Sequence, residues 1–348
     1  MPSSTSADNH SLGFKQLVER LLSVTPEIYH NFDIYRTEYS SANHEIGVDV
    51  LIPKHLATLT SVPLIVRIHG GFLVTGSNLF PAWFSPWILE FAAAKGAVII
   101  SPNYRLLPEA NGIDVIEDLK AFWAWFRDGE PQRYLDSLGR TPLSLDTNHL
   151  LLVGESAGGY LALQSVLLHM SRPQAMILLY PMIDMHSDYY NTRFEKTIVG
   201  VPNISEDVID AALQSFHAHK HYVTEADPPT RLDLAISIVQ NGRLGEFLGS
   251  EEILYPLDLL RSGDKEIAVS KLPPLFILHG EQDTAVPVHG TVEFVERVRD
   301  IAPDVKLHIA LRPGDHGFDA EASTGEPWLQ VGLDFVSRAW LGQPLSSL

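Results

Sequence analysis

The chain has 348 residues, of which 45% are hydrophobic and 20% are charged, a balance typical of a folded globular protein. A formal net charge of -18 would repel phosphate backbones and anionic membrane surfaces, so nucleic acid is not expected as a partner. Because the chain has no cysteine, disulfides, thiolate metal sites and a cysteine nucleophile are excluded.

Short β-branched or apolar runs alternate along the chain with longer helix-like stretches. This pattern predicts an α/β fold with a mostly parallel central sheet flanked by helices. The expected strands cover residues 32–39, 45–52, 64–68, 97–100, 150–153, 175–180, 275–279 and 306–310. The expected helices, which repeat apolar residues at three- and four-residue spacing, cover residues 82–95, 113–127, 157–170, 291–300 and 328–339. The first two strands are separated only by a short turn and are expected to pair antiparallel.

Residues 183–270 interrupt this alternation, because they contain helix-like pieces among loops and prolines but no clear strand. Ligands bind beyond the carboxyl ends of the strands in open α/β sheets, so we interpret this segment as a helical cap over that edge. The amphipathic residues 14–22 are expected to pack with the cap. The chain is therefore divided into a catalytic core and an N-terminal segment with a cap, at residues 45–182 and 271–348 for the core, and 1–44 and 183–270 for the rest.

A serine lies at the sharp turn between the strand at 150–153 and the following helix, in the sequence Gly154-Glu155-Ser156-Ala157-Gly158-Gly159. Such a turn presents the serine hydroxyl above the sheet, while the glycines let strand and helix pass closely. A glycine-rich turn with a helix-capping serine is the other interpretation. The motifs in the rest of the chain favour a nucleophilic Ser156.

Two consecutive glycines, Gly70 and Gly71, follow the strand at 64–68. Their unobstructed N–H groups can point at one spot, as the oxyanion of a tetrahedral intermediate requires, although a plain strand-to-helix turn would also use them. The amide of Ala157, at the start of the next helix, is the expected third donor.

A carboxylate and a histidine follow the two late strands. His316 lies in a glycine-bounded loop, and its ordinary pKa near neutrality suits a group that takes the serine proton and returns it to the leaving group. Asp283, three residues after Gly280, is expected to orient His316 and stabilise its imidazolium form. Glu281 and Asp315 are the competing acids.

These motifs, with His69-Gly70-Gly71-Phe72 and Asn103-Tyr104-Arg105-Leu106-Leu107-Pro108-Glu109, resemble the hormone-sensitive-lipase-like carboxylesterases of the α/β-hydrolase fold over about residues 64–318. The chain order serine, aspartate, histidine is also that of the α/β-hydrolase triad. The resemblance implies a capped serine esterase that acts on short or medium acyl esters without a cofactor. It also implies the roles of six residues: the nucleophile Ser156, its partners Asp283 and His316, and the oxyanion-hole amides of Gly70, Gly71 and Ala157.

The chain departs from the family pattern at two positions. Phe72 stands where a third glycine is frequent and is expected to narrow the pocket mouth, and Leu107 replaces an alanine. Glu155 stands where Asp or Glu is seen. Arg105 and Glu109 are expected to be ion-pair partners rather than catalysts.

Aromatic residues gather after the two glycines. Phe72, Trp83 and Trp87 are the expected substrate-binding residues of an apolar pocket, although aromatics at helical spacing are also typical of a core. The alternating histidines at 217, 219 and 221 do not share a helix face, so no metal is expected there.

The expected reaction is acyl transfer from a small to medium apolar ester to water through an acyl-enzyme. A lactonase, an amidase, an acyltransferase or a natural-product-pathway hydrolase with the same triad stays an alternative. A non-catalytic small-molecule receptor on this fold, of the kind found in plant gibberellin receptors, is disfavoured by the presence of His316. A homodimer is left open.

No signal peptide or apolar run of membrane-spanning length occurs, so we expect a cytoplasmic protein without integral membrane association. The final Ser346-Ser347-Leu348 lacks the basic middle residue of the peroxisomal signal and is interpreted as a tail.

Overall fold

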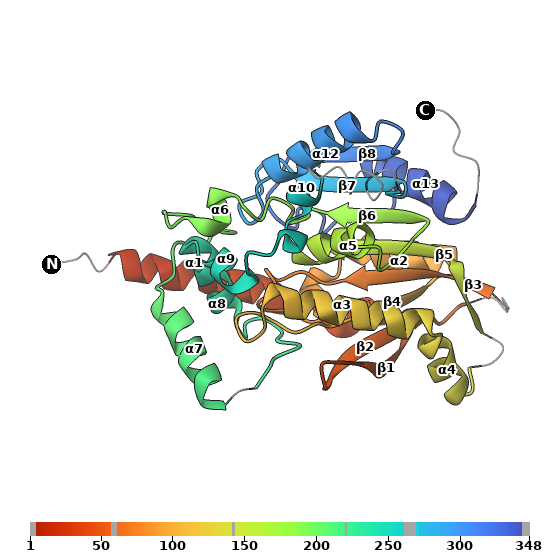
Figure 1. The fold of residues 1–348 in the computed structure, drawn as a ribbon, viewed down its shortest axis with the longest axis horizontal. Helices are drawn as coiled ribbons and strands as arrows, with labels where there is room; N and C mark the ends of the chain where they lie inside the picture. Colours follow the sequence, from red (N-terminus) through yellow and green to blue (C-terminus); the bar gives the residue numbers. More distant parts are fainter. Residues whose placement is uncertain are drawn as a thin grey trace.

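The computed structural model describes residues 5–56, 61–140, 143–219, 221–260, 269 and 271–342. An eight-stranded sheet with the order β1-β2-β4-β3-β5-β6-β7-β8 forms its centre and carries helices on both faces (Figure 1). The strands are β1 (Phe32–Ser41), β2 (His44–Pro53), β3 (Ser61–Ile68), β4 (Val98–Pro102), β5 (Ser144–Glu155), β6 (Ala175–Leu179), β7 (Leu275–Gly280) and β8 (Leu307–Arg312). The predicted α/β class with a mostly parallel sheet is confirmed.

The first two strands form the predicted hairpin, in which Phe32 pairs with Pro53 and Ser41 with His44. β2 joins β4 antiparallel, and every later pairing from β4 through β3 to β8 is parallel. The central strands are buried on both faces, which explains why they read as continuous apolar runs in the sequence. Since β1 belongs to this sheet, the sheet begins before residue 45, where the core was expected to begin; the division into core and cap stays a prediction.

Two buried apolar clusters cover the two faces of the sheet, because successive side chains of a strand point to opposite faces. On one side pack α3 (Gly112–Arg127), α5 (Ala157–Leu167) and α12 (His289–Ile301), and on the other α2 (Pro86–Lys95) and α13 (Pro327–Trp340). The helix expected over residues 82–95 is divided into a 3₁₀ turn, Pro81–Trp83, and α2. Pro86 explains the break, because it has no N–H for a helical hydrogen bond and is tolerated only in a first turn.

The segment between β6 and β7, which we call the cap, consists of helices joined by loops in the residues that the structure describes. It contains α6 (Asp188–Asn191), α7 (Asp207–His219), α8 (Leu232–Gln240), α9 (Leu244–Leu248), the 3₁₀ turn Glu252–Leu254 and α10 (Pro256–Leu259). The N-terminal helix α1 (Thr5–Leu22) packs against it, since a Cβ added to Gly13 would lie 2.5 Å from the Gly200 carbonyl oxygen. Leu17 and Leu21 of α1 join the same apolar cluster as the cap.

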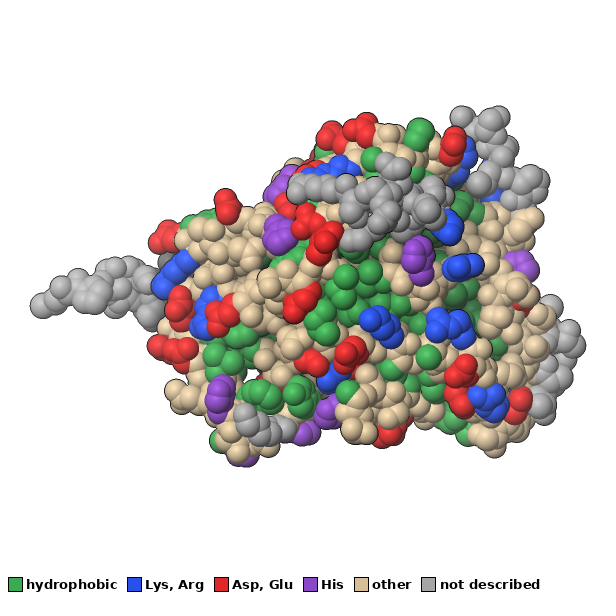
Figure 2. All heavy atoms as spheres, in the orientation of Figure 1, with side chains coloured by type: hydrophobic (Ala, Val, Ile, Leu, Met, Phe, Trp, Pro, Cys, Tyr) green, Lys and Arg blue, Asp and Glu red, His purple; other side chains and the backbone are tan. Residues whose placement is uncertain are grey.

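The surface carries both signs of charge. On the face drawn in Figure 2, the Lys and Arg side chains lie singly or in small groups among acidic ones, as expected for a chain of net charge -18. Among the described residues, no helix combines the length and the apolar character needed to span a bilayer. A cytoplasmic location stays a prediction, and the C-terminal tripeptide lies outside the described residues.

Candidate active site

Ser156 lies between the end of β5 and the start of α5, with φ 56° and ψ -119°. This positive φ is unusual for a residue with a side chain and is held by hydrogen bonds from several elements. The Ser156 amide donates to the Leu179 carbonyl at 2.9 Å, and the Ser156 carbonyl accepts from the amides of Gly159 at 2.9 Å and Met182 at 3.1 Å. The turn therefore has the strained geometry that the sequence predicted.

The glycines around Ser156 are required by close backbone approaches. A Cβ added to Gly158 would lie 2.1 Å from the Ile68 carbonyl oxygen, and one added to Gly154 would lie 2.3 Å from the Gly158 carbonyl oxygen. A Cβ added to Gly70 would lie 3.0 Å from the Cβ of Ser156. The loop after β3 therefore packs directly against the serine.

The loop of residues 70–76, which we call the oxyanion loop, and Ser156 line one cavity. In the described part of the chain, the amides of Gly70 and Gly71 donate to no protein acceptor. The amide of Ala157, as the first residue of α5, has no acceptor within the helix. Three backbone donors are thus available beside the serine, as an oxyanion requires.

Two bulky residues of the oxyanion loop have left-handed backbone conformations. Phe72 has φ 55° and Leu73 has φ 65°, a region that glycine adopts easily and other residues rarely do. This conformation explains physically why glycine suits the position of Phe72. Phe72 lines the cavity, and its role in substrate binding stays a prediction.

His69 supports the oxyanion loop from below. Burial lowers the pKa of His69 to about 3, so the imidazole is neutral, and its Nδ1 lies 2.8 Å from the Gly70 carbonyl oxygen. Because a carbonyl only accepts, Nδ1 carries the proton and donates it to Gly70. Tyr104 stacks on the imidazole at 4.4 Å and donates its hydroxyl to the His69 carbonyl at 2.8 Å.

His316 and Asp283 form a hydrogen-bonded pair, with 2.8 Å between His316 Nδ1 and Asp283 Oδ2. The other carboxylate oxygen accepts from the amides of Ala285 at 2.9 Å and Val286 at 2.7 Å. Burial alone would raise the pKa of Asp283, but the imidazoles of His316 and His279 hold this pKa well below its usual range. Burial alone would lower the pKa of His316, but the Asp283 carboxylate raises it above its ordinary value.

The two competing acids have other positions. Asp315 accepts hydrogen bonds from the Thr284 amide at 2.7 Å, from the Thr284 hydroxyl at 2.8 Å and from the His316 amide at 2.7 Å. It therefore connects the loop after β7, which carries Asp283, to the loop after β8, which carries His316. Glu281 is exposed. Asp283 is therefore the carboxylate that the structure pairs with the His316 ring.

Ser156 and His316 line the same cavity, which has a volume of about 450 Å³. Tyr180 packs edge-on against the His316 ring at 4.4 Å. The wall is mostly apolar and includes Leu17, Leu21, Phe72, Trp83, Phe84, Leu232 and Ile236. The contributions of α1 and α8 were missed in the sequence, because an amphipathic pattern predicts a buried face but not the cavity that this face borders.

Trp83 lines the cavity as expected, but Trp87 does not. Trp87 is fully buried in the core behind the wall, where its indole N–H donates to Asp319 at 2.8 Å. Trp87 faces the sheet from α2 and belongs to the buried core, as aromatic residues at helical spacing often do. The expectation that it binds substrate is therefore wrong, whereas Trp83 lies in the cavity wall.

These positions predict opposite effects for two similar substitutions. Trp83→Ala is expected to raise KM for a p-nitrophenyl ester by about tenfold, because it removes apolar contact with the acyl group. Trp87→Ala is expected to lower the free energy of unfolding by about 3–5 kcal/mol and to leave KM unchanged. Urea unfolding and Michaelis curves of both variants check this, and a raised KM with intact stability in Trp87→Ala would contradict it.

A buried ion pair lies beneath the serine. Arg67 of β3 donates to the Glu155 carboxylate from Nε at 2.7 Å and from Nη2 at 2.9 Å, and both side chains are almost fully buried. The same guanidinium donates to the carbonyls of Asn78 at 2.9 Å and Trp83 at 2.6 Å. Arg67 therefore joins the residue before the nucleophile to the wall of the cavity.

The expected ion pair between Arg105 and Glu109 is wrong. Arg105 binds Asp118 at 2.8 Å and Asp114 at 3.2 Å, which lie one turn apart on the same face of α3. Glu109 instead binds Arg231 of the cap at 2.7 Å.

The described residues contain no group of three or more His, Asp or Glu side chains that could hold a metal ion. His217 and His219 of α7 are exposed, and each Nδ1 contacts a carbonyl one turn earlier in the helix.

Residues 65–240 match a family model described as the alpha/beta hydrolase fold. The chain is 32% identical over 311 residues to the probable carboxylesterase M8 of a Phoma species, covering 87% of this chain and 95% of that protein. It is also 24% identical over 324 residues to the non-reducing polyketide synthase stbA of Stachybotrys bisbyi, covering 84% of this chain but 14% of the synthase. A thermostable esterase from Pseudomonas putida has a similar structure, with a TM-score of 0.60 and 17% identity over 95% of this chain and 89% of that one.

Proposed function

The chain belongs to the hormone-sensitive-lipase-like carboxylesterases of the α/β-hydrolase fold, and we propose that it cleaves small to medium apolar esters through an acyl-enzyme on Ser156. The family resemblance predicted from the sequence is thus confirmed. The observation that supports the assignment of the site most strongly is a shared cavity. Ser156, at a strained turn, lines it together with His316, whose ring is hydrogen-bonded to Asp283 at 2.8 Å.

The proposed reaction follows from the protonation states in the site. His316 keeps its Nδ1 proton and donates a hydrogen bond from it to ionised Asp283. Its unprotonated Nε2 can then accept the hydroxyl proton of Ser156. The serine oxygen attacks the ester carbonyl, and the amides of Gly70, Gly71 and Ala157 stabilise the oxyanion. His316 then protonates the leaving alcohol, and water repeats the same steps to release the acid.

The cavity supports an apolar acyl group as the substrate class, because aromatic and aliphatic side chains form most of its wall. A second candidate, an enzyme that hydrolyses or transfers a polyketide-derived acyl group, is favoured by the similarity of 84% of this chain to part of a polyketide synthase. Comparing an oxygen ester with a thioester of the same acyl group, with and without an added alcohol, distinguishes the two. Faster turnover of the thioester, or an ester product, would favour the second candidate.

The direct test of the proposal is to treat the protein with a fluorophosphonate and to locate the adduct by peptide mass spectrometry. The expected result is one equivalent bound to Ser156, together with hydrolysis of p-nitrophenyl esters of graded acyl length. A protein that bound esters but was neither labelled nor active would be a receptor on this fold instead.

The raised pKa of His316 predicts the acid limb of the pH profile. Only the neutral imidazole can act as base, so kcat/KM is expected to fall about tenfold per pH unit on the acid side. The midpoint should lie above the ordinary histidine value of 6.5, because the Asp283 carboxylate outweighs burial and favours the charged imidazole. Initial rates in a constant-ionic-strength buffer series measure this midpoint, and a value at or below 6 would contradict it.

A further inference from the structure

A buried ion pair outside the proposed triad joins the cap to the segment that follows β4. Arg231 donates to the Glu109 carboxylate from Nη1 at 2.8 Å and from Nη2 at 2.7 Å, and the two side chains are only 13% and 8% exposed. Arg231 directly precedes α8, whose residues Leu232 and Ile236 line the cavity. One end of this ion pair is therefore fixed in a wall of the substrate cavity.

The same guanidinium binds the backbone of the oxyanion loop. Its Nε donates to the Val74 carbonyl at 2.9 Å, and its Nη2 also donates to the Leu107 carbonyl. The Leu107 amide in turn donates to the Leu73 carbonyl at 2.8 Å. Arg231 therefore binds the Val74 carbonyl directly. It also supports the Leu73 carbonyl indirectly, through Leu107.

The oxyanion loop needs such support because of its backbone conformation. Phe72 and Leu73, directly after Gly70 and Gly71, both have left-handed φ values. Side chains disfavour this region, and it persists only where surrounding contacts over-determine it. Without the hydrogen bond to Val74, the loop can relax and carry the two glycine amides away from the serine.

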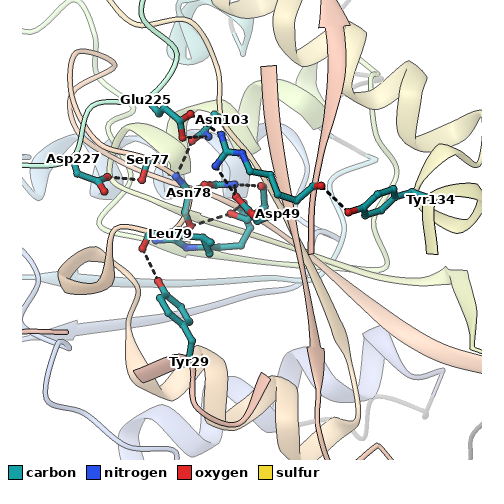
Figure 3. Close-up of polar contacts among 12 residues, drawn as sticks. Tyr29, Asp49, Ser77, Asn78, Leu79, Asn103, Tyr134, Glu225 and Asp227 are labelled. Atoms are coloured by element: carbon teal, nitrogen blue, oxygen red, sulfur yellow. Dashed lines mark hydrogen bonds and ion pairs between the residues drawn. The ribbon is translucent and has the colours of Figure 1, made fainter. Parts of the chain in front are cut away.

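The cap segment before Arg231 reinforces the same loop. The backbones of Gly76 and Ala226 exchange two hydrogen bonds, at 2.7 and 2.8 Å. Beside this bridge, Ser77 donates to Asp227, and Asn103 links Glu225 to the amide of Asn78 (Figure 3). The cap is therefore connected to the chain on the C-terminal side of Gly71, at Val74 and again at Gly76 and Ser77.

We propose that Arg231, held by Glu109, is a positioning residue that keeps the Gly70 and Gly71 amides aimed at the oxyanion. Seating of the cap and assembly of the oxyanion hole are then one event. This inference rests on the proposed function, because it takes these amides as the donors of the tetrahedral intermediate.

The test is Arg231→Met, assayed with p-nitrophenyl butyrate. Misplaced oxyanion donors weaken binding of the transition state and not of the substrate, so kcat should fall about 10- to 100-fold while KM stays within about threefold. The inhibition constant of an alkylboronic acid, which forms a tetrahedral adduct with the serine, should rise by a similar factor. A folded variant with kcat within twofold of wild type, or with a change in KM alone, would overturn the proposal.

Arg193→Met is the matched control, because it removes a cap ion pair, to Glu206 at 2.6 Å, that makes no contact with the oxyanion loop. Its kcat, KM and boronic acid affinity should equal those of the wild type, and an equal loss of kcat would overturn the proposal. If Arg231→Met does not fold, Glu109→Gln decides by the same split between kcat and KM, since it removes the charge but keeps an acceptor. Failure of the proposed function is separate, since it would appear as an unlabelled and inactive wild type.

Discussion

Ser156→Ala is expected to lower kcat for p-nitrophenyl butyrate by about a millionfold, the scale on which loss of the nucleophile acts in serine hydrolases. Without the hydroxyl no acyl-enzyme can form, and the oxyanion loop and His316 can assist only direct attack by water. Ser156 is 6% exposed and its hydrogen bonds to Leu179, Gly159 and Met182 are made by the backbone, so the fold should be retained. Initial rates at high enzyme concentration, with a thermal melt, measure both effects.

Ser165→Ala is the matched control for this variant. Ser165 lies in α5, the helix that follows Ser156. It is fully buried and donates its hydroxyl to the Leu161 carbonyl at 2.8 Å without lining the cavity. Its kcat should stay close to that of the wild type. Near-normal hydrolysis by Ser156→Ala would show that another group is the nucleophile.

Asp283→Asn is expected to lower kcat by about ten thousandfold, because an amide neither fixes the productive tautomer of the histidine nor stabilises its imidazolium form. The loss of the carboxylate should also lower the pKa of His316, since Asp283 is the main group that raises it against burial. The acid limb of kcat/KM should therefore move to lower pH in the residual activity. An acid limb that does not move would contradict the assigned pair.

Asp315→Asn separates the chosen acid from its competitor. Asp315 accepts hydrogen bonds from Thr284 and from the His316 amide. None of these hydrogen bonds involves the imidazole ring of His316. Replacement of Asp315 should reduce kcat far less than Asp283→Asn does and should lower the melting temperature. A loss equal to that of Asp283→Asn would show that the histidine depends on both carboxylates alike.

The fold and most of the candidate site could be predicted because their signals are local in the chain. Glycine is needed at positions 154 and 158 because the neighbouring backbone leaves no room for a Cβ atom. This requirement can be recognised in the sequence around Ser156. Apolar runs that alternate with helical patterns predict the sheet. Asp283 and His316 each follow a late strand, and parallel strands bring such positions to one edge.

The ion pair of Glu109 could not be predicted, because its partner is distant in the sequence. Glu109 is four residues after Arg105 in the same motif, yet it pairs with Arg231, 122 residues away. The ion-pair partner of Glu109 depends on how the cap folds over the sheet. A local sequence pattern does not predict this arrangement. Trp87 shows the same limit, since its spacing fits both a core and a pocket wall, and only the break at Pro86 separates it from Trp83.

The buried ion pair of Arg67 and Glu155 limits which substitutions this chain can accept in evolution. Losing either partner alone leaves an uncompensated charge in the interior, which costs about 3–5 kcal/mol, whereas replacing both with apolar groups of similar volume is often neutral. The two positions are 88 residues apart in the chain, so any crossover between relatives that falls between them separates the pair. A chimaera that inherits Glu155 without a cation at position 67 starts with a destabilised floor beneath its nucleophile, even if every group of the triad is intact.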